Sequence, residues 1–331
     1  MTSPQSVEQR AEAFRATFQH VTDQVRLAFV GHHALVEQAL IAFFCGGHTL
    51  IEGAPGLGKT LLVRTIAQSL RLTYSRVQCT PDLLPGDVTG TNILTDGPQG
   101  ARVFSFHKGP IFANVVLADE INRATPRTQS AFLEAMQEHQ VTIFGTTHEI
   151  AAPFAVFATE NPIEMEGTYP LPEAQLDRFF FKLLMPSPTT DEMAEIISRT
   201  TGTATIQPAP QVDAATVAGM MSLIREVPVA DDVVRLALRL VRATHPDADE
   251  APLRIRQYGR YGASPRAAQA LILGAKAHAL LNRRYHVAKD DIRAVAPAAL
   301  RHRVLVNFQA EMEHVAVDSL VADVLASAEA H

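Results

Sequence analysis

The chain has 331 residues, of which 47% are hydrophobic and 19% are charged, and its formal net charge is -6. This length exceeds one ordinary domain and falls short of three, and this composition excludes disordered and fibrous proteins. No long run of Lys or Arg is present, so the broad basic surface of a nucleic-acid-binding protein is not expected. We therefore expect a globular protein of two domains with no nucleic-acid partner.

Cysteine usage and the N-terminal residues bear on the cellular compartment. Cys45 and Cys79 form no Cys-x-x-Cys pair, so we expect two buried, reduced thiols rather than a disulfide framework or a thiolate metal site. The polar first ten residues lack the apolar core of a signal peptide, and no segment approaches the roughly 18 apolar residues of a membrane helix. These features predict a soluble, cytoplasmic protein without a membrane span.

The first fifty residues are predicted to be mainly helical. Apolar residues recur at helical spacing over residues 7–29 and again over 34–44, where Gly46-Gly47 ends the pattern. Residues 48–52 then favour a short strand, a glycine-rich loop follows, and residues 61–70 favour a helix. The order is strand, loop, helix.

Further apolar segments are predicted to be strands buried on both faces. A helix is predicted over residues 125–138 between them. Alternation of strand and helix is typical of a parallel sheet that helices cover on both faces, so the fold class is α/β. The strand segments are 74–79, 114–118, 154–158 and 179–185.

Two short segments interrupt this alternation and are predicted to be β-hairpins. The first spans residues 92–106 around a turn at 96–100, and the second spans 140–150 around a turn at 145–148. Their tips carry few positive charges, which argues against contacts with nucleic acid.

Proline residues mark a change in the chain at Pro186-Ser187-Pro188, since every later pattern is helical. We therefore predict three parts: an N-terminal helical cap at 1–30, an α/β domain at 31–186 and a smaller all-helical domain at 187–331. The helical patterns of the last part cover 191–199, 214–225, 231–242, 264–284, 289–300 and 315–325.

The glycine-rich loop fits the phosphate-binding pattern G-x-x-x-x-G-K-[ST], with the sequence Gly53-Ala54-Pro55-Gly56-Leu57-Gly58-Lys59-Thr60. Its glycines allow backbone N–H groups to surround phosphate oxygens, and the positive end of the helix dipole points at the same anion. In this interpretation Lys59 neutralises the β and γ phosphates of ATP, and Thr60 ligates Mg²⁺. The alternative is a chance match, but the pattern lies between a predicted strand and a predicted helix.

A second motif, Val115-Val116-Leu117-Ala118-Asp119-Glu120, ends an apolar strand with two carboxylates. Asp119 would hold Mg²⁺ through water, and Glu120 would orient or deprotonate an attacking water. Alternatively, acidic residues after a strand only cap the next helix. None of the 13 histidines lies in a metal-ligand pattern, so Mg²⁺ with the nucleotide is the only metal expected.

With these motifs the sequence resembles the MoxR family of AAA+ ATPases over nearly its whole length. The resemblance implies an ATP-driven hexameric ring with chaperone-like or assembly functions, with a protein client and often with a partner that carries a von Willebrand factor A domain. It is carried by Gly53 to Thr60, Thr80-Pro81-Asp82-Leu83-Leu84-Pro85-Gly86-Asp87, Lys108-Gly109-Pro110-Ile111-Phe112, Ala118-Asp119-Glu120-Ile121-Asn122-Arg123-Ala124, Ala158-Thr159-Glu160-Asn161-Pro162, Leu171-Pro172-Glu173-Ala174-Gln175-Leu176-Asp177-Arg178-Phe179 and Gly262-Ala263-Ser264-Pro265-Arg266.

The resemblance also implies roles for three further residues. Asn161 is similar to the sensor 1 residue that positions the attacking water, although Asn before Pro is also a common turn. Arg178 is similar to the arginine finger that reaches the γ phosphate of a neighbouring subunit; on its own it could be a strand-end ion pair. Arg266 is similar to sensor 2, which couples the lid to the nucleotide.

Arg266 also has a physical argument of its own. Ser264 and Pro265 favour a helix start, so Arg266 lies in a first turn where positive charge costs about 0.3 to 1 kcal/mol. A nearby phosphate would offset that cost, and the alternative is a solvated surface arginine.

The two hairpins resemble insertions of this clade that face the pore of related rings and touch the substrate. Phe144 and His148 are the exposed candidates, with inward packing as the alternative for Phe144. Val30 and Gly31 resemble residues that contact the adenine. His32-His33 follows them, where many relatives have Gly-Gln.

Three other functions share the nucleotide site. A nucleic-acid-dependent motor would need Lys or Arg at the hairpin tips, and residues 145–148 have neither. A nucleotide-gated scaffold would need neither Glu120 nor Arg178. A metal-chelatase-type motor subunit would share this core and these hairpins. We expect an ATPase, producing ADP and phosphate, that remodels, matures or assembles a protein complex.

Overall fold

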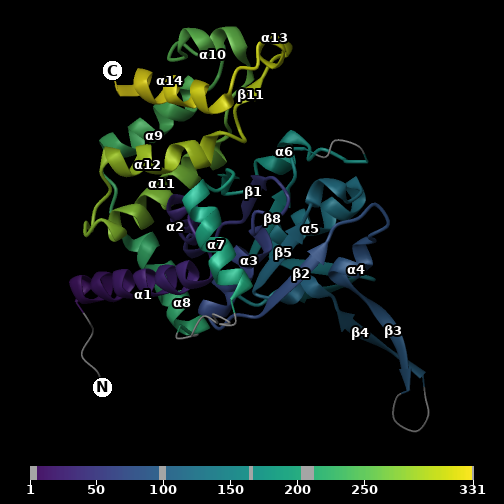
Figure 1. Ribbon diagram of the computed structural model, residues 1–331. Helices are drawn as coiled ribbons and strands as arrows, with labels where there is room; N and C mark the ends of the chain where they lie inside the picture. Colours follow the sequence, from purple (N-terminus) through teal and green to yellow (C-terminus); the bar gives the residue numbers. More distant parts are fainter. Residues whose placement is uncertain (1–5, 97–101, 164–166, 203–211, 330–331) are drawn as a thin grey trace.

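The computed structural model describes residues 6–96, 102–163, 167–202 and 212–329, and a five-stranded sheet lies at its centre (Figure 1). The strand order is β2-β5-β8-β1-β9, and every neighbouring pair is parallel. The predicted α/β class is confirmed. The strands are β1 (Thr49–Gly53), β2 (Tyr74–Gln78), β5 (Val115–Asp119), β8 (Ala155–Glu160) and β9 (Phe181–Met185).

Both faces of the sheet are buried, which explains why its strands are continuous apolar runs. In β5, Val115 and Leu117 belong to one hydrophobic cluster, and Val116 and Ala118 belong to a second. Helices α2 (His33–Phe44) and α3 (Lys59–Ser69) contribute to the first cluster, and α5 (Pro126–Glu138) contributes to the second. Alternate side chains therefore point to opposite faces, and each face is covered by helix.

The N-terminal helix α1 (Val7–Ala28) packs against this core rather than projecting from it. Ser6 begins the helix with a capping box to Gln9. The rings of Phe14 and Phe18 lie 6.3 and 5.7 Å from that of Phe44 in α2. Burial of these aromatic rings fixes the helix across the core.

The C-terminal part is mainly helical, as predicted, and forms the green to yellow upper left of Figure 1. Gly274 in α11 has no room for a Cβ, which would lie 2.9 Å from Cζ of Phe181 in β9, so glycine allows this close approach. The predicted boundary at 186 falls between β9 and α7, and the division into three domains remains a prediction. The helices are α7 (Thr190–Thr201), α8 (Ala214–Glu226), α9 (Asp231–Ala243), α10 (Leu253–Tyr258), α11 (Pro265–Leu281), α12 (Lys289–Leu300), α13 (Phe308–Met312) and α14 (Val317–Glu329).

The prediction that this part contains only helices is wrong in one respect. Strands β10 (Gly259–Tyr261) and β11 (Leu305–Val306) form a short antiparallel ladder. Strands of two or three residues are too short to show the alternating pattern that identifies a strand in sequence.

Both predicted hairpins are present. The first pairs β3 (Gly90–Asp96) with β4 (Arg102–Lys108) and projects from the body of the protein (Figure 1). Its predicted turn at 96–100 lies almost entirely outside the described residues. In the second, β6 (Gln140–Ile143) pairs with β7 (Thr146–Glu149).

The predicted turn of the second hairpin, at 145–148, is wrong. The turn consists of Phe144 and Gly145, which have positive φ angles of 47° and 80°. Such a two-residue turn matches the twist of the strands, and the β-branched Thr146 and Thr147 pair within the ladder instead.

The two hairpins contact each other through aromatic rings. His148 of β7 stacks on Phe106 of β4 with 3.9 Å between the ring centroids and 25° between the planes. His148 is therefore half-buried, whereas Phe144 at the tip is 82% exposed, as expected.

Sequence expectations about the thiols and the membrane can also be compared with the structure. Cys45 and Cys79 are both buried and free, and burial raises the pKa of Cys79 to about 12. Across the described ranges, no helix combines the length and apolar character that crossing a membrane requires.

His48 is a buried polar residue that joins two elements of the core. Its Nε2–H donates to the carbonyl of Met136 in α5 (2.9 Å), and its Nδ1 accepts from the N–H of Val156 in β8 (3.0 Å). Burial lowers the pKa of this imidazole to about 4. The neutral ring thus satisfies two backbone groups at once.

We predict that His48 makes the protein sensitive to acid. Because its folded pKa is about 4 and the unfolded value is 6.5, the unfolded chain takes up the proton first as pH falls below 6.5. Because of His48, the free energy of unfolding should therefore fall by about 2 kcal/mol between pH 7 and pH 5. Urea unfolding of His48→Gln at both pH values should show a decrease in the free energy of unfolding that is about 2 kcal/mol smaller than in the unmodified protein. The exposed His286→Ala should lose as much stability as the unmodified protein, and equal losses in all three proteins would contradict the assignment.

Candidate active site

The glycine-rich loop connects β1 to α3 at the carboxyl edge of the sheet. Gly56 and Gly58 have φ angles of 80° and 91°, in the left-handed region that favours glycine. A Cβ on Gly58 would also lie 3.2 Å from Cε2 of Phe29, so a side chain here would crowd the loop. The loop therefore has the backbone form in which N–H groups can surround an anion.

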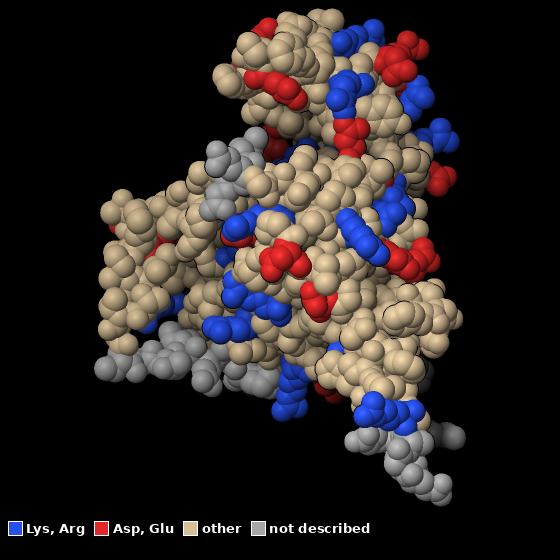
Figure 2. Space-filling view, turned by 90° about the vertical axis from the view of Figure 1, so that its right-hand side faces the viewer, with Lys and Arg blue, Asp and Glu red and all other residues tan. Residues whose placement is uncertain are grey.

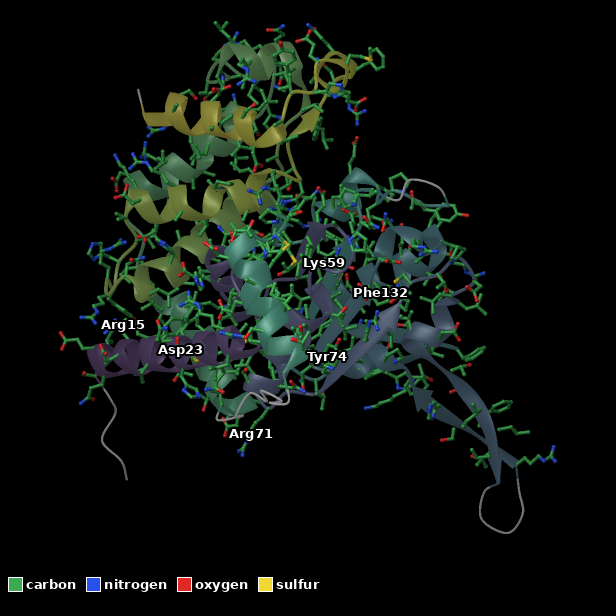
Figure 3. The ribbon with its side chains drawn as sticks, in the orientation of Figure 1. Arg15, Asp23, Lys59, Arg71, Tyr74 and Phe132 are labelled. Carbon is green, nitrogen blue, oxygen red and sulfur yellow. The ribbon has the colours of Figure 1, made fainter. Side chains whose placement is uncertain are left out.

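Lys59 lies at the first residue of α3 and is only 8% exposed (Figure 3). Its ammonium group donates to the carbonyls of Gly53, Ala54 (3.2 Å) and Glu160 (3.4 Å). Burial lowers the pKa of Lys59, and the nearby carboxylates of Asp119 and Glu120 oppose that shift. The ammonium is thus held between the loop and the end of β8.

The carboxylate of Asp119 accepts four hydrogen bonds. Thr159 donates to Oδ1 (2.7 Å), and Thr60 donates to Oδ2 (3.3 Å). Arg76 donates to Oδ2 twice, from Nε (3.0 Å) and Nη2 (2.7 Å). Asp119 is 7% exposed, so these donors replace water around a buried charge.

Thr60 and Asp119 provide the oxygen atoms that would suit Mg²⁺. This hard cation prefers oxygen ligands and keeps several waters, so it needs few protein groups. The hydroxyl and the carboxylate meet at the end of the phosphate-binding loop. The described residues contain no cluster of three or more His, Cys, Asp or Glu that could hold a metal by itself.

Thr159 fixes the two consecutive acidic residues relative to each other. Its hydroxyl donates to Asp119 and accepts from the N–H of Glu120 (2.8 Å). Glu120 has a φ of 57°, an uncommon conformation for a residue with a side chain. Because of this backbone turn, the side chains of the adjacent residues Asp119 and Glu120 have different hydrogen-bond partners.

The side chain of Glu120 is held by two neighbours. Gln78 at the end of β2 donates to Oε2 (3.2 Å), and Arg123 donates to the same oxygen (3.1 Å). The carboxylate is therefore positioned at the sheet edge by groups from β2 and from the turn after β5.

Asn161 follows β8, which lies between β1 and β5 in the sheet. Its Oδ1 accepts from the N–H of Ile163 (3.1 Å), which orients the amide. Its Nδ2 is buried and finds no acceptor in the part of the chain that the structure describes. A buried donor without a partner is costly, so this N–H is suited to a ligand beside Lys59.

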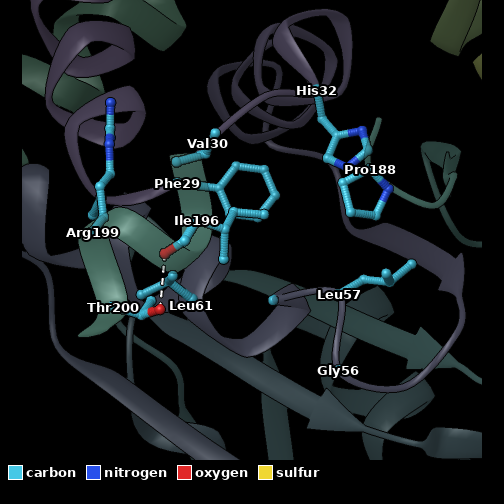
Figure 4. Close-up of a pocket in the computed structure, with 12 residues that line it drawn as sticks. Phe29, Val30, His32, Gly56, Leu57, Leu61, Pro188, Ile196, Arg199 and Thr200 are labelled. Carbon is cyan, nitrogen blue, oxygen red and sulfur yellow. Dashed lines mark hydrogen bonds between the residues drawn. The ribbon is translucent and has the colours of Figure 1, made fainter. Parts of the chain in front are cut away.

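An apolar pocket of about 240 Å³ adjoins the loop (Figure 4). Phe29, Val30 and Pro188 line it, together with Leu61 of α3 and Ile196 of α7. The predicted contact residue Val30 lies in this wall. Gly31 instead allows α7 to approach, since its φ is 74° and a Cβ would lie 2.3 Å from Oε1 of Glu192.

Arg178 and Arg266 lie at the other edge of the sheet. β9 runs from Phe181, beside Thr49, to Met185, beside Gly53, so residues 177 and 178 precede the amino end of this strand. The strand alone spans about 13 Å. Arg178 donates to the carbonyl of Leu133 in α5 (2.8 Å) and borders a surface cavity of about 270 Å³.

Asp177 organises the charges at this edge. It accepts from the Ser264 hydroxyl (2.8 Å), from Arg303 Nε (2.9 Å) and from Arg266 Nη1 (3.4 Å). The negative charge that the helix start at Arg266 requires is thus supplied within the chain by Asp177, where sequence reasoning invoked a phosphate. Arg266 pairs with Asp177 and Arg178 bonds to α5, and within the described residues no hydrogen bond or ion pair joins either of them to Lys59.

Comparison with known proteins gives the family. The model of the ATPase family associated with various cellular activities (AAA) matches residues 48–181, and the AAA lid domain matches residues 251–324. The chain is 40% identical to Chaperone MoxR1 of Mycobacterium tuberculosis, over 93% of this chain and 81% of that one. It belongs to the MoxR family of AAA+ ATPases.

Two further relatives and a solved structure are also similar to this chain. The chain is 39% identical to the uncharacterized protein YeaC of Bacillus subtilis, over 92% of each chain. It is 29% identical to Protein MoxR of Methylorubrum extorquens over 89% of each. The crystal structure of a presumed ATPase from Cytophaga hutchinsonii superposes with a TM-score of 0.90 at 39% identity, covering 97% of this chain and 96% of that one.

Four residues that hold the two carboxylates were given no role in the sequence analysis: Arg76, Gln78, Arg123 and Thr159. Thr159 precedes Asn161 by two residues in β8, and Arg76 and Gln78 alternate along β2. Polar residues near the carboxyl end of an otherwise apolar strand are a usable signal. The partners of the strand residues, however, depend on the register between strands.

We predict that Asp177 is essential for stability at the second edge. Its partner Arg303 has a side chain only 3% exposed, so Asp177→Ala would leave a buried guanidinium without its carboxylate. Loss of one partner of a buried pair should lower the free energy of unfolding by about 3 kcal/mol, measured by urea titration. Asp290→Ala removes the 78% exposed partner of Arg293 and should change the midpoint little. Similar small effects of both substitutions would show that Asp177 does not stabilise Arg303.

Proposed function

We propose that this chain hydrolyses ATP to ADP and phosphate with Mg²⁺ at the site formed by β1, β5 and β8. The observation that supports this most is the convergence of Lys59, Asp119, Glu120 and Asn161 at one edge of the sheet. The family membership supports the same activity. A site built only to bind nucleotide would need neither a positioned carboxylate at Glu120 nor a buried amide at Asn161.

Each residue has a role in this proposal. Backbone N–H groups of residues 53–60 and the Lys59 ammonium would bind the β and γ phosphates. Thr60 and Asp119 would hold Mg²⁺, which supplies positive charge beside the phosphate oxygens when it is bound. Asn161 Nδ2 would orient the attacking water, and Glu120 would accept a proton from it.

The apolar pocket would hold the nucleobase. It adjoins Gly56 and Gly58 of the loop and has walls from Phe29, Val30 and α7. The Thr200 hydroxyl in this wall already donates to the carbonyl of Ile196 (2.8 Å, dashed in Figure 4), so it is not an unpaired polar group. An apolar surface of this kind suits a planar base.

Arg178 and Arg266 would act on the site of a neighbouring subunit. Both lie at the edge opposite the loop of their own chain. A complete site therefore requires the carboxyl edge of one subunit to face the Arg178 edge of the next, an arrangement that closes into a ring. We infer a homo-oligomer, with the hexamer of related rings as its form.

The client would be a protein. Ile93, Leu94 and Phe104 of the first hairpin and Phe144 of the second are exposed apolar side chains, which indicate contacts with a protein surface. The face in Figure 2 shows acidic and basic side chains interspersed rather than a continuous basic field. One relative is named a chaperone. We propose remodelling, maturation or assembly of a protein complex, together with a partner that carries a von Willebrand factor A domain.

Glu120→Gln should separate binding from turnover. The amide keeps the shape of the side chain but cannot accept a proton, so steady-state phosphate release should fall by about 10² to 10⁴-fold. Binding of ATP, measured by calorimetry, should remain close to that of the unmodified protein. A variant that retains full turnover would exclude Glu120 as the base.

Mixing two inactive variants should restore activity if sites are shared. Arg178→Ala should lower turnover by about 10³ to 10⁵-fold while keeping an intact loop and Glu120. In a mixed ring, a site is complete where an Arg178→Ala subunit, which keeps Glu120, lies next to a Glu120→Gln subunit, which keeps Arg178. Random mixing at 1:1 gives this order at about a quarter of the interfaces, so about a quarter of the sites should be active. Phosphate release from the mixture measures this. No gain in rings of confirmed mixed composition would mean that Arg178 acts elsewhere.

A further inference from the structure

Arg76 is a charged residue of the site that the proposed reaction does not use. It lies in β2, the edge strand beside β5, and its side chain is 48% exposed. Both of its hydrogen bonds to Asp119 go to Oδ2, the oxygen to which Thr60 also donates. The guanidinium therefore lies at the same carboxylate oxygen that faces the Thr60 hydroxyl, the proposed ligand of Mg²⁺.

The Oδ2 oxygen of Asp119 has no free acceptor site. A carboxylate oxygen has about two lone-pair sites, and Thr60 and the two N–H groups of Arg76 already give Oδ2 three donors, whereas Oδ1 accepts from Thr159 alone among the described residues. Thr159 is fully buried and also accepts from Glu120 N–H, so it cannot leave without breaking the turn. Thr60 can donate to Asp119 and ligate a cation with its oxygen at once. Arg76 is therefore the donor that a metal-bound water would have to displace at Oδ2.

Arg76 has a second partner that makes its departure possible. Nη2 also donates to Oε1 of Gln78 (2.6 Å), and the guanidinium reaches solvent. Arg76 can therefore release Asp119 without being left as an unpaired buried charge. Asp119, in contrast, is buried and needs a positive charge beside it at all times.

We propose that Arg76 is an internal counter-ion that stabilises Asp119 when no metal is bound and competes with Mg²⁺ for its Oδ2. The proposal rests on the function proposed for this site. Its consequence is that Mg²⁺ strengthens nucleotide binding less than the same site would allow without Arg76. Removing the guanidinium should therefore increase the dependence of nucleotide affinity on Mg²⁺.

Calorimetric titration with ADP, in Mg²⁺ and in excess EDTA, tests this without turnover. The ratio of the two affinities measures how strongly Mg²⁺ and ADP favour each other's binding. Arg76→Ala should raise this ratio roughly tenfold or more, since two charge-assisted hydrogen bonds no longer oppose the metal. Arg76→Lys keeps the charge with a different donor geometry, so its affinity ratio should lie between those of the unmodified protein and Arg76→Ala. Arg235→Ala is the matched control, because it removes an exposed positive charge from α9 and should leave the ratio unchanged.

The outcomes separate the two proposals. If ADP does not bind the unmodified protein, the proposed function fails. If ADP binds and Arg76→Ala leaves the ratio unchanged or lowers it, Arg76 does not compete with the metal and the inference is overturned. A rise in Arg235→Ala equal to that in Arg76→Ala would show an effect of net charge only, which also overturns it.

Discussion

The parallel alignment of β1, β5 and β8 is the constraint on which the site depends. Gly53, Asp119 and Asn161 are far apart in sequence and meet because parallel strands end at the same edge. The register of the three strands aligns their ends, since Ala118 of β5 and Leu50 of β1 both lie beside Ala158 of β8. Burial of both faces of the sheet holds this register, because a slip by one residue would exchange the two hydrophobic clusters.

The sheet also separates two kinds of positive charge. Lys59 is enclosed by carbonyl groups at the carboxyl edge, whereas Arg178 and Arg266 lie at the amino edge, one against α5 and one against Asp177. The span of β9 keeps them apart within one chain. A single fold thus places these two sets of positive charge at opposite edges of the sheet, as the proposed ring would need if the two edges of neighbouring subunits face each other.

Sequence was sufficient for the parts of the protein that have a local pattern. The loop from Gly53 to Thr60, the apolar strands and the long helices all repeat or match a spacing, and the family resemblance is confirmed by the comparisons. The ladder of β10 and β11 was missed because two or three residues show no period. The turn at Phe144 was misplaced because its conformation depends on strand twist rather than on residue type.

The contacts of the site were less predictable than its members. Asp119 and Glu120 could be named from their motif, but Arg76 and Thr159 reach them from other strands, and no single segment contains that information. Arg266 illustrates the same limit. A phosphate was expected beside Arg266 from the sequence, whereas in the structure its guanidinium pairs with Asp177, 89 residues away.

The stack of His148 on Phe106 has a mechanical consequence. The stack connects the two hairpins, so neither can move by itself unless the two rings separate. β4 continues through the short helix at Pro110–Phe112 into β5, whose last residue is Asp119. The second hairpin is therefore in contact with the continuous stretch of chain that leads from β4 to the carboxylate of Asp119.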